Sequence, residues 1–399
     1  LEAGLTTPAR VREFFVLTPL FGAGMFLVVL ANNLGVMWAA VEATALSSVL
    51  LVALYNRRHS LEAAWKYVML GSVGLALALL GTVFVYAAAC KGHSETLPTF
   101  HWSSLMRIAD QLDPHLLKLA FVLAFIGYGT KAGLAPMHTW LPDAHSEAPS
   151  PTSAMLSGVS LKIALYALLR FHILTTACLD TAFSRHLLLV FGLGSLLLAA
   201  PFILVQRNLK RLLAYSSLEH IGFICAAIAM NTPLTILGAL LHMGYHALTK
   251  PVLFFAAGNI HQTFHTLEFR GIGSGVVKVM PATAVCMGLA ALAAIGLPPF
   301  GLFLSEFLVL SAGLAAHQTA VSVLILLALV ASFCGILQHF TRILLGARRP
   351  GAQPVTARPW DGIPAMSMLL GGLLVLSVWL PSPLLELLRQ AAGIIGGQP

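Results

Sequence analysis

Long apolar runs follow one another through almost the whole chain, and this succession restricts the fold more than any other feature. About 18 consecutive apolar residues suffice for a helix to cross a bilayer. Because only 10% of the 399 residues are charged and 58% are hydrophobic, an ordinary soluble domain is excluded. Eleven such runs occur, at residues 14–32, 34–55, 65–90, 117–140, 150–175, 186–206, 211–230, 233–260, 281–312, 319–345 and 363–388.

The length of these runs also selects the type of membrane structure. Backbone amides and carbonyls inside a bilayer must be satisfied within the protein, so a spanning segment is either a helix or a strand of a closed barrel. Barrel strands are about ten residues long and alternate in polarity, which these runs do not. We therefore predict an all-α, polytopic membrane bundle of about eleven transmembrane helices.

The positive net charge is explained by membrane orientation. The formal charge is +8, but alternating spans place fourteen of the 23 lysines and arginines on one side of the membrane and six on the other, with three inside spans. The positive-inside rule assigns the richer side to the cytoplasm. Nucleic acid is therefore not an expected partner, and the lipid bilayer is.

Motifs for redox cofactors are absent from the sequence. The five cysteines are widely separated and form no C-x-x-C pair, which disfavours iron–sulfur, zinc and disulfide frameworks. No glycine-rich nucleotide loop and no pattern for flavin, haem or nickel ligation is present. We expect no cofactor, no metal and no catalytic residue for redox chemistry in this chain itself.

Two of the apolar runs contain helix-breaking residues. Gly133 and Pro136 interrupt the fourth run, and Pro298 and Pro299 interrupt the ninth. A proline removes a helical hydrogen bond and clashes with the preceding turn. Because the breaks are five spans apart, an odd number, a second copy would start on the opposite face of the membrane, as in the inverted repeats of secondary transporters. Two unrelated proline kinks are the alternative. The predicted units are an inverted pair of five-helix repeats at 14–175 and 186–346, followed by a C-terminal helix at 363–388.

Ionisable side chains lie inside the predicted spans, where each costs roughly 2.5–3.5 kcal/mol. A purely structural bundle has no need of them, so they are candidates for function. Five are most prominent, and they are Glu42, Lys131, Lys162, Lys250 and Glu306.

Lys131 is the most unusual of these groups. It follows Lys118 by thirteen residues, which places it about 20 Å into its span, too deep to reach the membrane surface easily. It is either tied to a carbonyl freed by the helix break or an amine that exchanges a proton beside that break. Glu42 lies eight residues into the second run, and a Glu42–Lys131 pair would act as a two-state electrostatic switch.

A row of titratable side chains occurs in L-H-M-G-Y-H-A-L-T-K. His242, His246 and Lys250 are spaced i, i+4, i+8, so they share one helix face over about 12 Å. We favour a proton relay along this face over packed core histidines. A metal site is the third alternative, but the H-E-x-x-H glutamate is missing.

Four further residues are expected to support this site. His138 lies in the broken stretch and can face the same water as Lys131. Asp143 follows Pro142, and we favour a role as cap of the next helix over anchoring of the loop. Glu219 and His220 form a polar pair that we place near a helix start.

Several stretches together resemble one family. They are V-E-A-T-A-L-S-S, K-A-G-L-A-P-M-H-T-W-L-P-D-A-H-S-E-A-P-S-P-T-S-A-M-L-S-G, L-A-Y-S-S-L-E-H-I-G, L-H-M-G-Y-H-A-L-T-K-P-V-L-F-F-A-A-G and G-L-P-P-F-G-L-F-L-S-E-F. From about residue 14 to residue 345 the chain is similar to the antiporter-like membrane subunits of complex I, of Mrp-type Na⁺/H⁺ antiporters and of membrane-bound nickel–iron hydrogenases. The stretch 32–52 most resembles the hydrogenase-4 branch.

The resemblance implies a role for each buried charge. In that family two inverted five-helix units form a proton path. Its membrane glutamate falls on Glu42, its broken-helix lysine on Lys131, its central lysine on Lys162 and its terminal group on Glu306. The polar axis between them corresponds to His242, His246 and Lys250. Members normally begin with about three more helices, so a fragment lacking upstream spans is expected.

The implied function is that of a proton-translocating subunit in a membrane-bound hydrogenase, formate hydrogenlyase or complex I-like oxidoreductase. The expected partners are other membrane subunits and, through them, hydrogenase-type peripheral subunits that carry out the redox chemistry. The expected location is the bacterial inner membrane. A Mrp-type monovalent cation/proton antiporter and a purely structural membrane scaffold are the alternatives.

Overall fold

The computed structural model describes residues 7–92, 99–179, 182–273, 275–346 and 362–397. Helices account for nearly all of these residues, and extended pairing among them is limited to two isolated β-bridges. The predicted all-α fold is therefore confirmed.

Eight α-helices lie in the first half of the described chain. They are α1 (Pro8–Leu30), α2 (Leu34–Val52), α3 (Arg58–Gly92), α4 (Trp102–Arg107), α5 (Pro114–Ala132), α6 (Trp140–Glu147), α7 (Ser150–Met155) and α8 (Leu161–Cys178). Short 3-10 turns occur at Ala53–Tyr55, Ala109–Gln111 and Met137–Thr139, and a π-helix at Leu156–Ser160 joins α7 to α8.

Ten α-helices follow in the second half of the described chain. They are α9 (Ala182–Val205), α10 (Leu209–Ala229), α11 (Pro233–Phe264), α12 (Phe269–Ile272), α13 (Val276–Val279), α14 (Pro281–Ala294), α15 (Gly301–Ala315), α16 (Thr319–Leu345), α17 (Ile363–Val378) and α18 (Ser382–Ile395).

The protein is a multi-pass membrane bundle. Eight helical segments of the described chain are long and apolar enough to cross a membrane, or nine if the bent pair α17 and α18 forms one span. The expected number of eleven is not confirmed. The other two predicted runs correspond to α11, whose histidines and lysine reduce its apolar character, and to α14 with α15, each too short to qualify alone.

Apolar side chains on the outside and polar side chains on the inside are the arrangement expected of a protein surrounded by lipid. Large apolar side chains face outward, as Phe26 and Leu30 of α1 do at 70% and 78% exposure, whereas Lys250 is fully buried. A water-soluble protein rarely exposes so many large apolar side chains together. The bundle therefore buries many of its polar side chains and has an apolar outer surface that faces the lipid.

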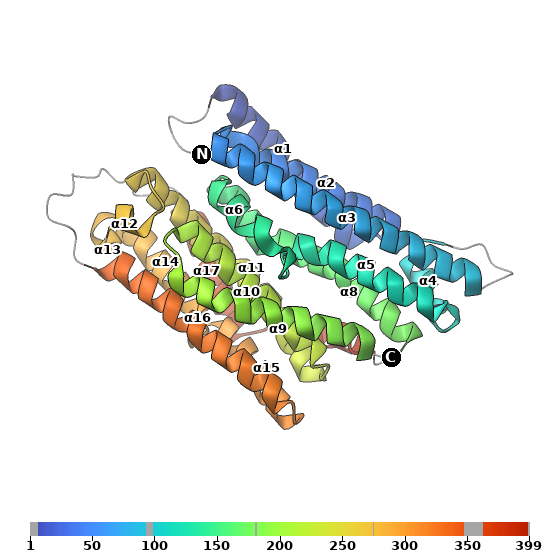
Figure 1. The fold of residues 1–399 in the computed structure, drawn as a ribbon. Helices are drawn as coiled ribbons and strands as arrows, with labels where there is room; N and C mark the ends of the chain where they lie inside the picture. Colours follow the sequence, from blue (N-terminus) through green and yellow to red (C-terminus); the bar gives the residue numbers. More distant parts are fainter. Residues whose placement is uncertain (1–6, 93–98, 180–181, 274, 347–361, 398–399) are drawn as a thin grey trace.

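The helices are arranged in successive layers (Figure 1). α1, α2 and α3 pack together along one side, and α5 lies between α3 and α8. α10 is central, because it contacts α9, α11 and α6 and buries nearly every residue between Leu209 and Ala229. Side chains on α10 and α11 can therefore meet inside the bundle, away from lipid.

The start of the second helix has the same local structure in each half. Asn33 caps α2 and Asn208 caps α10, each with its side-chain oxygen. Asn33 also forms a β-bridge with His101, and Asn208 forms one with Glu268. This recurrence supports the proposed inverted repeat at 14–175 and 186–346, which remains a prediction.

The two interrupted helices also end in the same way. α5 ends before Gly133, which adopts a left-handed φ of +80°, and α14 ends just before Gly296, with φ +67°. The amide of Leu134 donates to the carbonyl of Gly129 (2.9 Å), and the amide of Leu297 donates to that of Leu292 (3.1 Å). Glycine tolerates this conformation because it has no Cβ, so both breaks are Schellman-type helix ends.

The C-terminal region differs from the prediction of one helix at 363–388. α17 ends at Val378, and α18 begins at Ser382 after a bend of 77°. Pro381 and Pro383 explain the interruption, because proline is accepted in the first turn of a helix but not in its interior.

Candidate functional site

Lys131 lies in the last turn of α5, beside the first helix break, and only 2% of it is exposed. Its Nζ atom donates a hydrogen bond to the hydroxyl of Tyr67 on α3. That hydroxyl lies 2.7 Å from Oγ of Ser48 on α2, which itself donates to the carbonyl of Thr44 at 2.6 Å. A hydrogen-bonded row thus connects the broken helix with α3 and α2.

The ring of Tyr67 is held in place from its other side. It stacks on the indole of Trp140, with ring centroids 4.3 Å apart and planes inclined by 14°. Nε1 of Trp140 donates to the carbonyl of Thr130 at 2.8 Å, one residue before Lys131. The break removes the i+4 amide partner of this carbonyl, and although the amide of Gly133 donates to it at 3.1 Å, the carbonyl can also anchor the aromatic stack beside the lysine.

The predicted ion pair between Glu42 and Lys131 is not formed. Oε2 of Glu42 is buried without a hydrogen-bond partner among the described residues, although the two charges interact through space. An ammonium group can only donate hydrogen bonds, and the hydroxyl of Tyr67 accepts one from it here. The structure therefore captures the lysine away from its predicted carboxylate.

Lys162 occupies the first turn of α8, directly after the π-helix. Its Nζ atom donates to the carbonyl of Ser157 and contacts Nδ1 of His246 on α11. A π-helix displaces carbonyls from the regular i→i+4 pattern, so it leaves an acceptor for the amine. Oγ of Ser157 lies 2.7 Å from Oγ of Ser217 on α10, which extends the polar contact to the central helix.

The histidine row lies along α11, as its spacing predicts. His242, His246 and Lys250 are all fully buried. Nε2 of His242 is 2.9 Å from Nδ1 of His220 on α10, and Nζ of Lys250 donates to the carbonyl of Leu213 at 3.2 Å. The row thus faces α10, which the prediction did not specify.

Glu306 lies on α15 and packs against the second helix break. A Cβ atom at Gly296 would lie 2.1 Å from Oε2 of Glu306, so only glycine leaves room for this carboxylate. The neighbouring Ser305 accepts a hydrogen bond from Nδ1 of His242, at 2.9 Å. The second break therefore holds an acid beside the end of the histidine row.

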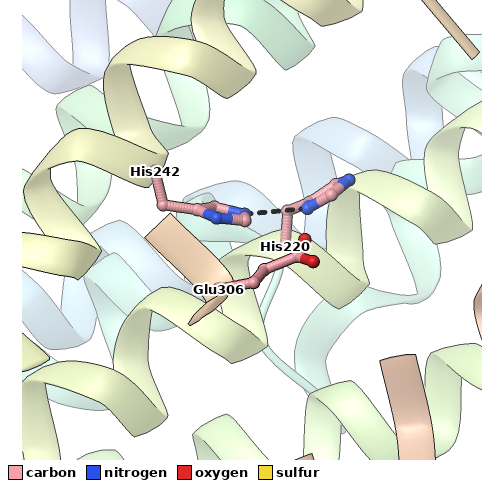
Figure 2. A group of neighbouring side chains, drawn as sticks. All are labelled: His220, His242 and Glu306. Carbon is pink, nitrogen blue, oxygen red and sulfur yellow. Dashed lines mark hydrogen bonds between the residues drawn. The ribbon is translucent and has the colours of Figure 1, made fainter. Parts of the chain in front are cut away.

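A possible ligand set for a metal appears where three helices meet. Donor atoms of His220, His242 and Glu306 lie within 4.8 Å of one another (Figure 2). The positive charges of Lys162 and Lys250 act on both histidines and oppose a divalent cation there. We assign no metal role to this group. From the sequence only His242 and His246 are candidate ligands, because periodicity does not show that α10 lies against α11.

Glu219 was expected near a helix start, which is wrong. It lies in the middle of α10, where nearly every residue is buried, and its Oε2 has no hydrogen-bond partner in the described part of the chain. Its charge interacts with those of Lys250 and Glu306. Glu219 and His220 therefore connect the lysine of α11 with the acid of α15.

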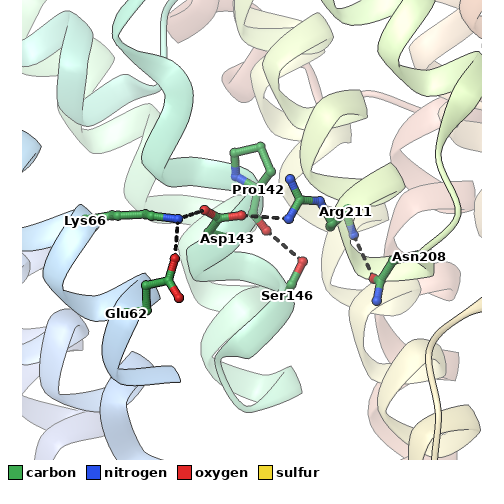
Figure 3. A network of polar contacts seen from close by, with 7 residues as sticks. All are labelled: Glu62, Lys66, Pro142, Asp143, Ser146, Asn208 and Arg211. Carbon is green, nitrogen blue, oxygen red and sulfur yellow. Dashed lines mark hydrogen bonds and ion pairs between the residues drawn. The ribbon is translucent and has the colours of Figure 1, made fainter. Parts of the chain in front are cut away.

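Asp143 does not act as the predicted helix cap. It lies inside α6, where Oδ2 is 3.1 Å from Nζ of Lys66 on α3 and Oδ1 is 2.7 Å from Nη1 of Arg211 on α10 (Figure 3). α7 begins only after Pro149, too far along the chain for a cap by this side chain. Asp143 instead joins the two halves at the side predicted to be cytoplasmic.

His138 lies in the turn at Met137–Thr139 and is buried. Its ring is 6.4 Å from that of Tyr215, and its Nδ1 has no hydrogen-bond partner among the described residues. No hydrogen bond joins His138 to Lys131 among the described residues.

Sequence reasoning missed the neutral groups of the site. Tyr67 binds the Lys131 ammonium, Ser48 binds Tyr67, and Ser305 binds His242, but none of the three carries a charge. A hydroxyl within an apolar run is common and bonds to its own helix, as Thr82 does to the carbonyl of Ala78. Only the spatial arrangement separates such residues from functional ones.

The match to a known family agrees with this geometry. Residues 31–333 match the family described as NADH:quinone oxidoreductase/Mrp antiporter, TM. The chain belongs to this family.

Two similar members of the NADH:quinone oxidoreductase/Mrp antiporter family are named as subunits of a hydrogenase and of a dehydrogenase. The hydrogenase-4 component F homolog of Methylacidiphilum infernorum (isolate V4) is 40% identical over 355 residues, which cover 89% of this chain and 74% of that protein. The F(420)H(2) dehydrogenase subunit N of Methanosarcina mazei is 32% identical in an alignment of 412 positions that covers 97% of this chain and 78% of that protein.

The fold of the family is also that of a solved structure. A chain of the membrane-bound sulfane sulfur reductase, an archaeal respiratory membrane complex, superposes with a TM-score of 0.87. The similarity covers 99% of this chain and 78% of that chain at 24% identity, so it concerns the fold alone.

Proposed function

We propose that this chain is a proton-translocating, antiporter-like membrane subunit of a hydrogenase-4-type or complex I-like oxidoreductase. Its proposed partners are other membrane subunits and, through them, peripheral subunits in which the redox reaction takes place. The proposed location is a bacterial cytoplasmic membrane. The similarity to the hydrogenase-4 component F homolog and to the dehydrogenase subunit supports this assignment.

One observation carries the proposal. Buried titratable side chains occur at intervals in the interior between the first helix break and the second, at Lys131, Lys162, His246, His242 and Glu306. Burial of this many ionisable groups in a membrane protein is expensive, and such groups usually mark ion or proton pathways. A structural scaffold does not require them.

The chemistry follows from pairing and release of charge. When Lys131 pairs with the carboxylate of Glu42, its proton is held; when the pair separates, the proton is easier to lose. No direct contact joins Lys131 to Lys162 in the described chain, so water has to carry the proton between them. Contact of Lys162 with His246 then passes it to α11.

The second half completes the path. His246 and His242 both lie against His220, with ring centroids 4.6 Å and 5.0 Å apart, respectively. Glu306 is the acceptor beside the second break, and Glu219 supplies a second carboxylate that interacts with Lys250 and Glu306. In each step one group gives up a proton and its neighbour accepts it, so each side chain alternates between its protonated and deprotonated forms.

Proton transport by the complete complex in lipid vesicles tests the proposal. Lys131→Ala and Glu42→Ala should abolish acidification driven by the redox partner, while assembly survives. Lys91→Ala is the matched control, because Lys91 pairs with Asp113 at a helix end and lies outside the path. Assembled Lys131→Ala complexes that transport normally would disprove the proposed role.

The Mrp-type cation/proton antiporter is distinguished in the same vesicles. A cation antiporter requires sodium or potassium on the opposite side and needs no redox partner. Transport that depends on sodium and continues without electron donor would favour this alternative. Transport that requires the electron donor and is indifferent to sodium would favour the oxidoreductase subunit.

A further inference from the structure

Tyr67 is the direct partner of Lys131, and no charged residue occupies that place. The phenol is 1% exposed, and its hydroxyl accepts the hydrogen bond of the lysine Nζ. Glu42, the carboxylate predicted to pair with Lys131, has a buried oxygen without a partner among the described residues. Two groups can therefore compete for one amine, a neutral hydroxyl and a carboxylate.

The direction of hydrogen bonding defines the role of the hydroxyl. A charged lysine has donors only, so the oxygen of Tyr67 must accept from it. The tyrosine proton then points to Ser48, 2.7 Å away. Ser48 in turn donates to the carbonyls of Thr44 at 2.6 Å and Ala45 at 2.9 Å. The row ends at backbone acceptors, so it holds the ammonium and carries no proton onward.

The position of the ring is fixed independently of the lysine. Tyr67 stacks on Trp140, and the indole is bonded to the carbonyl of Thr130 beside Lys131. A preorganised neutral acceptor loses little freedom when it binds the amine. The hydroxyl is thus a preorganised second binding position for the Lys131 ammonium, separate from Glu42.

We propose that Tyr67 is a positioning residue that receives the Lys131 ammonium when it leaves Glu42, with Ser48 orienting the hydroxyl. This inference rests on the proposed proton translocation. Without the hydroxyl, Lys131 remains paired with Glu42, and the switch between the two arrangements is lost. The effect on transport is indirect, through the position of the lysine.

Tyr67→Phe removes only the hydroxyl and keeps the aromatic stack. The complete complex carrying this variant should transport protons about tenfold more slowly, as expected for loss of one hydrogen bond to a charged group. In its cryo-EM structure Nζ of Lys131 should lie within ion-pair distance of Glu42. A residue that merely fills space would leave the lysine where it is.

Tyr86→Phe is the matched control. Tyr86 lies on the same helix and stacks on Phe100, with ring centroids 4.7 Å apart, and its hydroxyl makes no polar contact among the described residues. This variant should transport as the unaltered complex does. If the Tyr67→Phe complex is not assembled, Ser48→Ala replaces it, because the phenol then loses its acceptor and holds the lysine less firmly.

The outcomes separate the inference from the proposed function. An unmoved Lys131 in Tyr67→Phe, or a moved one with normal transport, overturns the positioning role. Normal transport by Lys131→Ala in the same vesicles overturns the proposed function instead. Slow transport together with Lys131 on Glu42 supports the inference.

Discussion

Nδ1 of His220 lies 2.9 Å from Nε2 of His242, in a hydrogen-bonded row that joins α10 to α15 and whose direction is set at Ser305. Ser305 donates its hydroxyl proton to the carbonyl of Leu302 at 2.8 Å, so it accepts from Nδ1 of His242. A neutral His242 then accepts at Nε2, and His220 donates. This leaves Nε2 of His220 as a buried acceptor without a partner among the described residues.

The same arrangement occurs at the first helix break. There Lys131, Tyr67 and Ser48 form a row that also ends at a backbone carbonyl. In both rows a serine bonded to its own helix orients the group next to it. The first row contains the lysine of its break, whereas the second row lies beside Glu306 and does not include it.

His242 is expected to be essential for transport through the second half. His242→Leu removes the contacts with His220 and Ser305 together and should lower proton transport about a hundredfold, the lower range for a positioned proton-transfer group. Fluorescence quenching in vesicles with the complete complex measures the rate. His186→Leu is the control, because His186 is exposed and, in the part of the chain that the structure describes, its hydrogen bond is to the carbonyl of Ala182 on its own helix. Equal rates for the two variants would exclude His242 from the path.

Asp143 is expected to matter for stability more than for transport. Asp143→Asn breaks its ion pairs with Lys66 and Arg211, which are 48% and 41% exposed at their side chains. Exposed pairs contribute little and are screened by salt. The thermal midpoint of the complex should therefore fall slightly at low salt and match that of the unaltered complex at about 1 M salt. A large loss that persists at high salt would indicate a role beyond surface pairing.

Asp113 provides a pH dependence outside the membrane-spanning segments. The hydrogen bond from Lys91, at 2.6 Å, holds the pKa of Asp113 below its ordinary value, with further help from the amides of Leu116 and His115. Because this pKa is lowered on folding, its contribution is complete above the unfolded pKa and is lost as pH falls through the folded one. Asp113→Ala should thus destabilise the complex at about pH 7 and have no further effect in strong acid, as thermal unfolding across pH would measure.

Much of the fold follows from the sequence because lipid imposes few solutions. Apolar runs in a membrane must become helices, so their positions predict α1 to α3 and α16 well. The breaks at Gly133 and Gly296 also follow from residue type, since φ is positive at both. The bend before α18 was missed, because a run with prolines near its end is equally compatible with one span and with two helices.

The site could be predicted only in part. Buried charges such as Lys162 are visible in a sequence because they are costly in an apolar run. Their partners are not, since periodicity places His246 on a face of α11 but does not say which helix that face meets. Asp143 was misassigned for the same reason, because its two cations come from helices distant in sequence.

Gly296 gives the sharpest test of the second break. In Gly296→Ala the new Cβ would lie 2.1 Å from Oε2 of Glu306, and an L-residue at φ +67° costs about 1–2 kcal/mol in addition. The carboxylate must move, so transport should fall at least tenfold while assembly is only weakened. Gly244→Ala is the control, because Gly244 lies on α11 between the histidines and, apart from its own neighbours and helix backbone, no atom lies within 4 Å of the place that an alanine methyl group would take. If Gly296→Ala assembles and transports like Gly244→Ala, the position of Glu306 against the break is irrelevant to proton movement.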